Sequence, residues 1–397
     1  MSHPLPLDGI TVVAVEQAVS APFATRQLAD LGARVIKIER PDGGDFARGY
    51  DTAAAGLASH FVWCNRGKES IAVDLKDPRG LEIVRQLVAD ADVFVQNLAQ
   101  GAAARLGLDA GTLCAAHPRL IAVDISGYGA EGPYAHKRAY DMLVQCEAGL
   151  VSVTGTAEQP VKAGIPAADI AAAMYAFSGV LAALLRRGAT GVGGPVEVSM
   201  LESLAEWMGH PLHYGMHGGE TPARTGVAHA VISPYDAYAT ADGGQVLLSV
   251  QNDREWQRLA DQVLGRPELG GDPAFATNTA RTANREKTDA VVAEALARLG
   301  TQEAIGRLEA AGIACARLNS VTDVARHPQL AARDRWREVD SPVGPLRALL
   351  PPITLPGEPE ARMGAVPALG EHTDALLKAL GMTDEGTAAL RRDGVVA

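Results

Sequence analysis

The sequence predicts an α/β fold built around a parallel, doubly wound sheet. An apolar run typical of a buried strand occurs at residues 10–16, and further strands are predicted at 34–39 and 93–96. Between them lie a helical segment at about 22–31 and an amphipathic helical segment at 78–89. Because strands that alternate with helices pair in parallel, this order favours a doubly wound sheet.

Further elements extend the same pattern. Strands are predicted at 70–75, 120–125 and 196–199, and a helix at about 201–215. A longer helix starts near Ala167 and is almost wholly apolar up to Leu185, so we expect it to be buried on every side. Charges at Asp169 and Arg186 leave fewer residues between them than the roughly 20 that a membrane span needs. We therefore expect no membrane segment.

A second domain is predicted where the composition changes. Between about 217 and 245 the chain is rich in Gly, Pro and polar residues, which is typical of a linker. A strand at 246–250 and helices near 253–264, 284–299 and 301–312 follow, then a Pro-rich extended segment from about 340 and a helix at 374–380. We divide the chain into a large domain (1–215), a small domain with its linkers (216–330) and a C-terminal return segment (331–397).

Composition limits the class of protein. Of the 397 residues, 47% are hydrophobic and 21% are charged, which is typical of a globular protein. The net charge of −11 argues against nucleic-acid binding. The N-terminus shows no secretory signal, and four scattered cysteines without a C-x-x-C motif are typical of reduced thiols. We expect a cytoplasmic location.

Asp169 carries the one charge between the start of the long apolar helix and Arg186. Two interpretations fit a carboxylate in a first helical turn. It complements the helix dipole, which stabilises anions at N-termini, or it is a partly buried carboxylate that acts on a substrate as nucleophile or acid/base group.

Basic and amide side chains follow several predicted strand ends. Ligands of open α/β sheets bind at the carboxyl ends of the strands, and cations gathered there in an acidic protein favour a polyanion such as a nucleotide. The alternative is ordinary surface charge. Neither the G-x-G-x-x-G fingerprint nor a G-x-x-x-x-G-K-[ST] loop is present. The residues concerned are Arg40, Lys76, Asn97, Arg105 and Arg138.

A metal site is the weaker interpretation of a histidine cluster. His210, His213 and His217 lie close together, with Glu206 one turn earlier. Because Pro211 interrupts the helix where the ligands would have to align, we expect surface or packing histidines and no bound metal.

Seven short motifs together give the chain a resemblance to the class III CoA-transferases. This family includes formyl-CoA transferase, carnitine CoA-transferase and α-methylacyl-CoA racemase. The motifs run nearly end to end: Pro6-Leu7-Asp8-Gly9-Ile10, Leu31 to Arg40, Asn65-Arg66-Gly67-Lys68-Glu69-Ser70, Val73-Asp74-Leu75-Lys76, Ser126-Gly127-Tyr128-Gly129, Ala168-Asp169 and Leu369-Gly370-Glu371-His372-Thr373.

The resemblance implies a Rossmann-like large domain completed by the return segment, a smaller α+β domain and an interlocked homodimer. It implies coenzyme A, carried as acyl-CoA, as co-substrate, and a small carboxylic acid as the second substrate. Asp169 matches the family's catalytic aspartate. The matching CoA contacts are Ala18, Val19, Arg40, Val73, Lys76, Asn97, Leu98, Arg105, Arg138 and Tyr140.

The implied reaction passes CoA from one acid to another through an aspartyl-CoA thioester on Asp169. Succinyl-CoA is the expected donor and a C4–C5 dicarboxylate, such as itaconate, citramalate or mesaconate, the expected acceptor. Oxalate-type transferases carry Gln at the place of Val19 and a glycine run where this chain has Gly226-Val227-Ala228-His229, which argues against oxalate. An acyl-CoA racemase and a CoA-binding subunit of a hetero-oligomeric transferase are the alternatives.

Overall fold

The computed structural model describes residues 4–219 and 221–397, which form two compact units. The first contains residues 4–150, 163–212 and 333–397, and the second contains residues 151–162, 213–219 and 221–332. The chain therefore passes between the units four times, and the first unit holds segments from both ends of the sequence. Each unit is described by itself.

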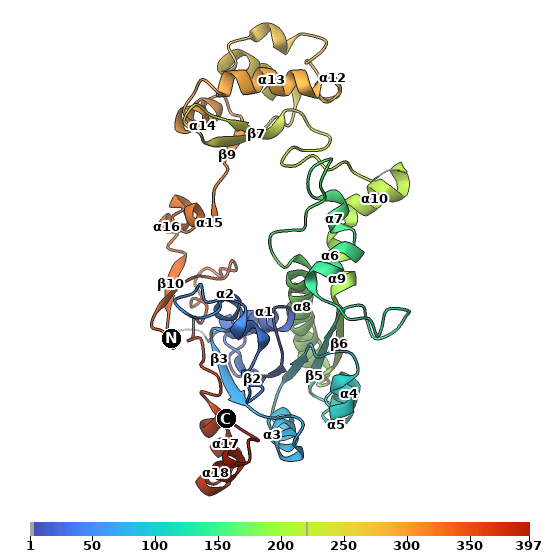
Figure 1. Cartoon of the computed structure of the whole chain (residues 1–397), viewed down its shortest axis with the longest axis vertical. Helices are drawn as coiled ribbons and strands as arrows, with labels where there is room; N and C mark the ends of the chain where they lie inside the picture. The colour runs from blue at the N-terminus through green and yellow to red at the C-terminus, as the bar shows by residue number, and fades with distance from the viewer. Residues whose placement is uncertain (1–3, 220) are drawn as a thin grey trace. The chain divides into compact units, whose positions relative to one another are not determined.

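A six-stranded parallel sheet forms the centre of the first unit (Figure 1), in the order β3-β2-β1-β4-β5-β6. This is the order of a dinucleotide-binding doubly wound fold, so the predicted parallel α/β sheet is confirmed. Its strands are β1 (Thr11–Val15), β2 (Arg34–Glu39), β3 (Lys68–Ala72), β4 (Val93–Gln96), β5 (Ile121–Ser126) and β6 (Gly194–Ser199).

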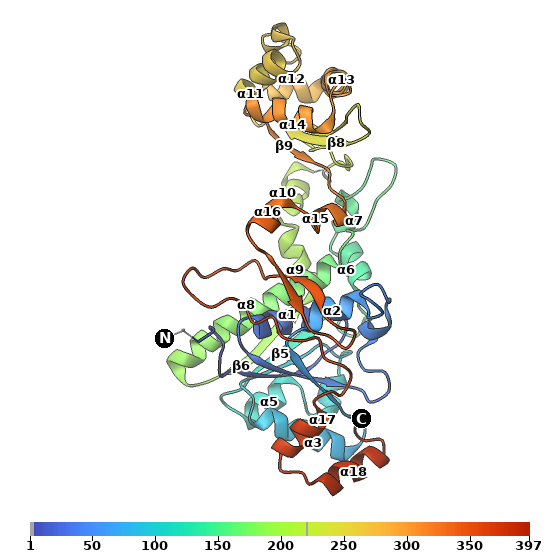
Figure 2. The ribbon, with the colours of Figure 1, turned by 90° about the vertical axis from the view of Figure 1, so that its left-hand side faces the viewer.

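Helices cover both faces of this sheet. The first face is covered by α1 (Ser20–Asp30), α8 (Ala167–Thr190) and α9 (Met200–Trp207). The opposite face is covered by α3 (Pro78–Ala89), α5 (Ala110–Ala116), α17 (Thr373–Ala379) and α18 (Asp384–Arg392). Figure 2, turned by 90°, shows α3, α5, α17 and α18 on the side of the sheet away from α1 and α8.

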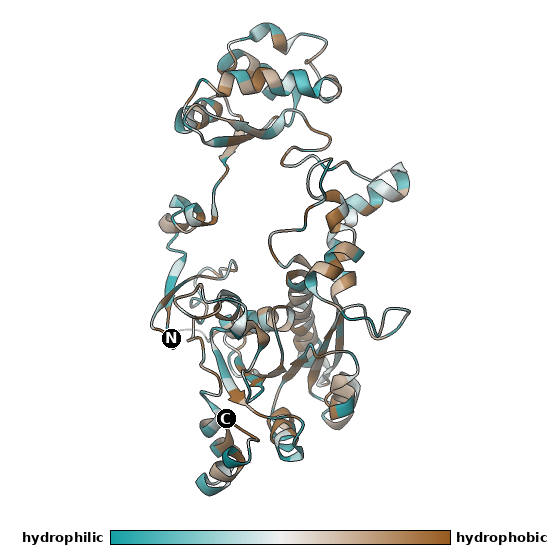
Figure 3. Ribbon diagram, viewed as in Figure 1, coloured by the Kyte–Doolittle hydropathy of each residue, from teal (hydrophilic) through white to brown (hydrophobic). Residues whose placement is uncertain are grey.

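The alternation of side chains along β1 explains why the sheet has two cores. Val12 and Ala14 pack with α1 and α8, whereas Val13 and Val15 pack with α3 and α17. Successive residues of a strand point to opposite faces, so a strand that is apolar at every position is covered on both sides. Figure 3 shows this apolar colour along the strands and mixed colour on the outer helices α3, α17 and α18.

Helix α8 is less enclosed than its composition predicts. One side packs on α1, α9 and the sheet, where Ala168, Ala172 and Phe177 are buried. Tyr175 and Leu185, however, are exposed, the latter at 78%. The helix is long and apolar enough to cross a membrane by length and composition alone, but core helices pass the same test. The expectation that α8 is buried on every side was therefore wrong for this single chain. Only the side of α8 that packs on the sheet, α1 and α9 is covered.

Two predicted boundaries were also wrong. The strand expected at 70–75 is β3, Lys68–Ala72. It starts earlier because the polar Lys68 is itself buried. The helix expected at 201–215 is two helices, α9 and α10 (Gly209–Gly218). Because α10 starts at Gly209, Pro211 lies in its first turn, where its missing N–H costs nothing.

The return segment joins the sheet through backbone contacts. A hairpin of β10 (Trp336–Val339) and β11 (Leu346–Leu349) precedes a long extended stretch. Further along, Val396 forms an antiparallel bridge with Val73, at the end of β3. Shorter elements of the first unit are η1 (Phe46–Gly49), α2 (Ser59–Asn65), α4 (Ala102–Leu106) and α6 (Asp141–Glu147).

The second unit is an α+β body with its own core. Its antiparallel sheet has the order β7-β8-β9, formed by Tyr235–Ala239, Gln245–Ser249 and Ala314–Arg317. Trp256, Leu296 and Leu308 lie in the core beneath the sheet. Its helices are α11 (Asp253–Arg258), η2 (Leu259–Val263), η3 (Pro267–Gly270), α12 (Asn278–Ala283), α13 (Arg285–Leu296), α14 (Thr301–Ala310), α15 (Val321–Val324) and α16 (Pro328–Ala332), and α7 (Leu150–Val153) begins at its boundary.

Candidate active site

Asp169 lies in the first turn of α8, on the third residue of the helix. Pro166 immediately precedes the helix, and its carbonyl accepts a hydrogen bond from the N–H of Ile170 at 2.9 Å. The side chain of Asp169 is half-buried, at the start of the helix that packs on the first face of the sheet. The sequence therefore places a carboxylate among the helix N-terminal N–H groups, which favour negative charge.

The pKa of Asp169 is nevertheless raised, to about 7. Burial is the larger cause, because desolvation disfavours the charged carboxylate. The nearby charge of Asp141 raises the pKa further, whereas the polar groups of Ser20, at the start of α1, lower it. Near neutral pH the group is thus close to half ionised, which is the range that acid/base and nucleophilic catalysis use.

Asp141 is a second carboxylate at this helix start, and the sequence did not single it out. Its Oδ1 accepts hydrogen bonds from the N–H groups of Ala168 (2.8 Å) and Asp169 (3.3 Å). Its Oδ2 accepts one from Nε2 of Gln145 at 2.7 Å. A carboxylate that accepts N–H bonds caps a helix N-terminus. The only sequence signal was its place next to Tyr140, since the capping contact spans 27 residues.

The loop between β1 and α1 holds an unusual backbone conformation. Ala18 has φ +61°, a left-handed conformation that costs a non-glycine residue roughly 1–3 kcal/mol. Its N–H donates to Oδ1 of Asp45 at 2.9 Å. The neighbouring Gln17 is held by Asn97, which accepts from its N–H (2.9 Å) and donates to its carbonyl (2.8 Å). The side chains of Asp45, in the segment after β2, and of Asn97, directly after β4, therefore fix this loop.

A buried ionic network contacts this loop through Asp45. Nζ of Lys37 donates to Asp45 at 2.8 Å and lies 3.4 Å from Oε1 of Glu16. Nζ of Lys68 donates to the same Glu16 oxygen at 2.6 Å. All four side chains are buried. The pKa of Glu16 is lowered by its two lysines against the effect of burial, while burial lowers that of Lys68 to about 8.

Four of the predicted CoA-contacting residues lie together at the carboxyl edge of the sheet. Ala18 and Val19 follow β1, Asn97 and Leu98 follow β4, and Asn97 joins the two pairs through its bonds to Gln17. The carboxyl ends of parallel strands are where open α/β sheets bind ligands. The structure therefore gathers these four residues at one place.

The remaining predicted contacts lie further along the same edge or outside it. Arg40, after β2, donates to the Gly44 carbonyl at 3.1 Å and its guanidinium lies over Phe46. Val73 is buried after β3, and the side chains of four other predicted residues are exposed at their loops or helix ends. The structure records no contact that brings these four together; they are Lys76, Arg105, Arg138 and Tyr140.

Two tyrosines, Tyr50 and Tyr140, belong to the surroundings of the candidate site through their charges. Tyr140 precedes α6 and is 68% exposed. Tyr50, also exposed, has its pKa raised first by partial burial and then by the charges of Asp45, Asp169 and Tyr140. Tyr50 therefore lies near both the candidate nucleophile and Tyr140. Sequence reasoning missed it, because an exposed aromatic residue after η1 gives no pattern.

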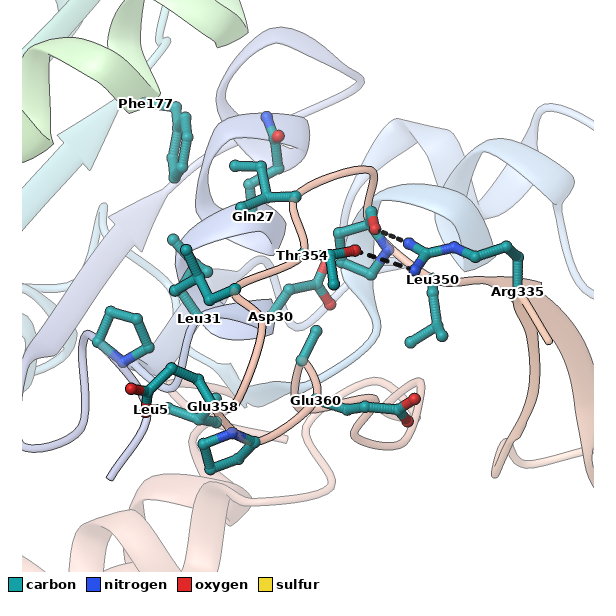
Figure 4. A pocket seen from close by; sticks show the side chains of 16 residues that line it. Leu5, Gln27, Asp30, Leu31, Phe177, Arg335, Leu350, Thr354, Glu358 and Glu360 are labelled. Carbon is teal, nitrogen blue, oxygen red and sulfur yellow. Dashed lines mark hydrogen bonds between the residues drawn. The ribbon is translucent and has the colours of Figure 1, made fainter. Parts of the chain in front are cut away.

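The pocket in Figure 4 lies away from Asp169. Its cavity of about 90 Å³ lies between α1, Phe177 of α8 and the return segment, where Arg335 donates to Thr354 at 3.2 Å. None of the predicted site residues lines it. A cavity of this size is too small for coenzyme A, since ligand pockets span roughly 300–1,000 Å³.

Among residues 4–219 and 221–397 there is no group of three or more His, Cys, Asp or Glu side chains that could hold a metal ion. His213 and His217, on α10, stack with ring centroids 5.7 Å apart. His213 and His217 are therefore arranged as a stacked ring pair.

Comparison with known proteins identifies the family. Residues 7–373 match the model of CoA-transferase family III. The chain is 34% identical to succinate–glutarate CoA-transferase of Agrobacterium fabrum, over 94% of this chain and 96% of that protein. It is 35% identical to acetyl-CoA:oxalate CoA-transferase of Acetobacter aceti, over 94% and 95%. The crystal structure of a CAIB/BAIF family protein from Brucella suis is 34% identical, covers 95% of this chain and 100% of that one, and superposes with a TM-score of 0.85. A carboxylate at a helix start, a doubly wound sheet and these matches agree, and the chain belongs to CoA-transferase family III.

Proposed function

We propose that this enzyme moves CoA from succinyl-CoA to a C4–C5 dicarboxylate through an aspartyl-CoA thioester on Asp169. The observation that carries the proposal is the half-buried Asp169 carboxylate, whose pKa of about 7 leaves a nucleophilic fraction at neutral pH. Itaconate, citramalate and mesaconate are candidate acceptors. Glutarate joins them, because a relative 34% identical is named for succinate and glutarate.

The steps follow from the chemistry of a carboxylate and a thioester. Asp169 attacks the acyl-CoA carbonyl, the C–S bond breaks, and an aspartyl anhydride and CoA thiolate form. The thiolate then attacks the aspartyl carbonyl, which releases the donor acid and leaves the aspartyl-CoA thioester. The acceptor carboxylate runs these steps in reverse. Because one thioester replaces another, the exchange needs no ATP.

Coenzyme A is held in this proposal by the carboxyl edge of the sheet. Ala18 and Val19, in the fixed β1–α1 loop, lie together there with Asn97 and Leu98, which follow β4. Arg40 and Arg105 carry guanidinium groups, whose donor forks match phosphate oxygens. Val73, Lys76, Arg138 and Tyr140 complete the proposed set, and no metal takes part.

We also propose that the enzyme works in the cytoplasm as an interlocked homodimer. Apolar residues exposed on α8 and α10, such as Leu185 and Met216, support a partner surface, because isolated monomers rarely expose many large apolar side chains in one helix. Light scattering of the purified protein tests the dimer. A stable monomer would contradict it.

The test of the function is a trapping experiment. Purified enzyme is incubated with succinyl-CoA and a panel of acids, including oxalate, and products are read by mass spectrometry. Hydroxylamine should trap acylated Asp169 in the wild type but not in Asp169→Ala, which should lose exchange while keeping its fold. Full exchange by Asp169→Ala would overturn the proposal. Exchange only after a paralogous subunit is added would favour the hetero-oligomeric alternative.

A further inference from the structure

We propose that Asp45 is a positioning residue for acyl-CoA, because it holds the backbone of the β1–α1 loop in the conformation that the ligand meets. The inference rests on the proposed function, which places coenzyme A against Ala18 and Val19. Asp45 lies between β2 and η1, caps η1 and is buried. It is not one of the proposed CoA contacts, so its effect reaches the ligand through Ala18.

The β1–α1 loop lies at the point where the strand order of the sheet reverses. In the order β3-β2-β1-β4-β5-β6, the chain runs outward from β1 on one side and from β4 on the other. Open α/β sheets bind their ligands in the crevice at such a point, outside the carboxyl ends of the strands. Asn97, after β4, bonds both the N–H and the carbonyl of Gln17, after β1. The backbone of the loop is therefore part of the wall of this crevice.

Ala18 needs outside contacts to keep its conformation. Its φ of +61° lies in the left-handed region, which non-glycine residues avoid because Cβ comes too close to the following carbonyl oxygen. Asn and Asp tolerate this region through a local hydrogen bond of the side chain, and a methyl group forms none. The N–H of Ala18 donates instead to Oδ1 of Asp45 at 2.9 Å, across 27 residues of sequence.

Both oxygens of Asp45 face donors. Oδ1 accepts from the N–H groups of Ala18 and Ala47, each at 2.9 Å, and Oδ2 accepts from Nζ of Lys37 at 2.8 Å. An amide of the same shape would turn its NH2 group toward one of these donors, so a carboxylate is needed to satisfy all three. The N–H of Asp45 donates to Oε2 of Glu39 at 3.0 Å. Asp45 is thus an anchored acceptor to which the loop conforms.

Loss of this acceptor should weaken binding more than chemistry. Without the bond the left-handed conformation becomes a minor one, and the apparent affinity of a ligand falls with the fraction of competent molecules. In Asp45→Ala we expect KM for acyl-CoA to rise about 5- to 100-fold with less change in kcat, which corresponds to the usual cost of such a conformation. Asp242→Ala is the control with unchanged KM, because that carboxylate also accepts a backbone N–H, from Thr301 at 2.9 Å, but in the second unit.

Ala18→Gly in the Asp45→Ala background separates positioning from general stability. Glycine adopts positive φ about as readily as negative φ, so the double variant should lower KM again toward the wild-type value. The glycine restores no contact of Lys37 or Ala47, so repair of the fold would not explain the recovery. An unchanged KM in Asp45→Ala would overturn the inference, and so would a raised KM that Ala18→Gly does not lower.

A second pair of variants covers the case in which Asp45→Ala does not fold because Lys37 loses a partner. Lys37→Met with Asp45→Asn keeps an acceptor for the N–H of Ala18, whereas Lys37→Met with Asp45→Ala removes it. Neither leaves a charge of this ion pair behind. The Asn version should have the lower KM, and equal KM values would overturn the inference.

The wild type separates this inference from the proposed function. If hydroxylamine traps Asp169 in the wild type while the Asp45 variants keep its KM, the inference alone fails. If the wild type shows neither trapping nor exchange of CoA, the proposed function fails.

Discussion

Asp141 accepts a hydrogen bond from the backbone N–H of Asp169 at 3.3 Å, so the carboxylates of both residues meet at one helix start. The arrangement has two opposed effects on the nucleophile. The capping bonds of Asp141 fix the first turn of α8, while its negative charge raises the pKa of Asp169 beyond what burial alone does. Position and reactivity are thus set by the same neighbour.

Removal of that neighbour's charge should shift the pH dependence of the enzyme. In Asp141→Asn the amide oxygen still accepts from Ala168, but the repulsion is gone, so the pKa of Asp169 falls below its present value of about 7. The acid limb of kcat/KM should therefore move to lower pH. Asp374→Asn, which only loses an exposed ion pair with Arg391, is the control. A limb that stays in place would show that Asp141 does not set this pKa.

Neutralisation of the nucleophile should stabilise the protein. The native pKa of Asp169 lies above the unfolded value of 3.8, so the native state binds the proton more tightly. Its contribution to stability is therefore neutral below about pH 4 and unfavourable above about pH 7. Asp169→Asn should raise the free energy of unfolding at pH 8, with the gain fading toward pH 4. Urea unfolding at both pH values measures it, and an equal effect at both would contradict the expectation.

The cations of the proposed CoA site should act on binding. Arg40→Ala and Arg105→Ala should each raise KM for acyl-CoA with less effect on kcat, the pattern of lost uniform binding. Arg298→Ala, which only removes an exposed pair with Glu294 in the second unit, is the matched control. Unchanged KM in both test variants would remove these residues from the site.

The buried network should matter for stability. In Glu16→Gln, the ammonium groups of Lys37 and Lys68 lose their shared carboxylate in a site from which water is excluded. Lys37 keeps its ion pair with Asp45, whereas Lys68 is left with neutral acceptors only. We therefore expect the free energy of unfolding to fall by about 3–5 kcal/mol, as for a buried charge that loses its partner. Adding Lys68→Met should recover part of it. Urea denaturation of both variants checks this, and a single variant as stable as wild type would show that the charge is not needed.

The enzyme should exchange CoA without racemising 2-methylacyl-CoA. Racemisation needs a base at the carbon next to the thioester, and the racemases carry His in a Gly-His-Asp segment. Here the segment is Ala139-Tyr140-Asp141, and a Tyr with an ordinary pKa of about 10 is a poor base. Incubation in D₂O should leave the α-carbon unlabelled. Deuterium incorporation as fast as CoA exchange would favour the racemase.

Local signals predicted much of the fold. β2 and α3 occur as expected, because Val35, Ile36 and Ile38 favour a strand and α3 has a Pro in its first turn and an Asp77 cap. β3 was misplaced, since burial of Lys68 depends on Glu16, 52 residues away. α6, α18, β7 and β9 were not predicted. Short elements of this kind are defined by what they pack against more than by their own pattern.

The candidate site was predictable only where one residue carried the signal. Asp169 stands out as a charge in an apolar helix. Asp141 and Ser20 contact residues far along the chain, across 27 residues from Asp141 to Ala168 and 77 residues from Ser20 to Asn97. Such contacts exist only once the sheet has brought the loops together, and no spacing in the sequence encodes them.

The edge strand β3 has a consequence for the order of events during synthesis. The N–H of Ala72 donates to Oγ1 of Thr373, which is 301 residues later in the chain. A ribosome adds roughly 5–20 residues per second, so this strand waits on the order of 15–60 seconds for its partner. During that interval its edge is open to other nascent chains, which makes translation speed and chaperone capture determinants of yield in this protein.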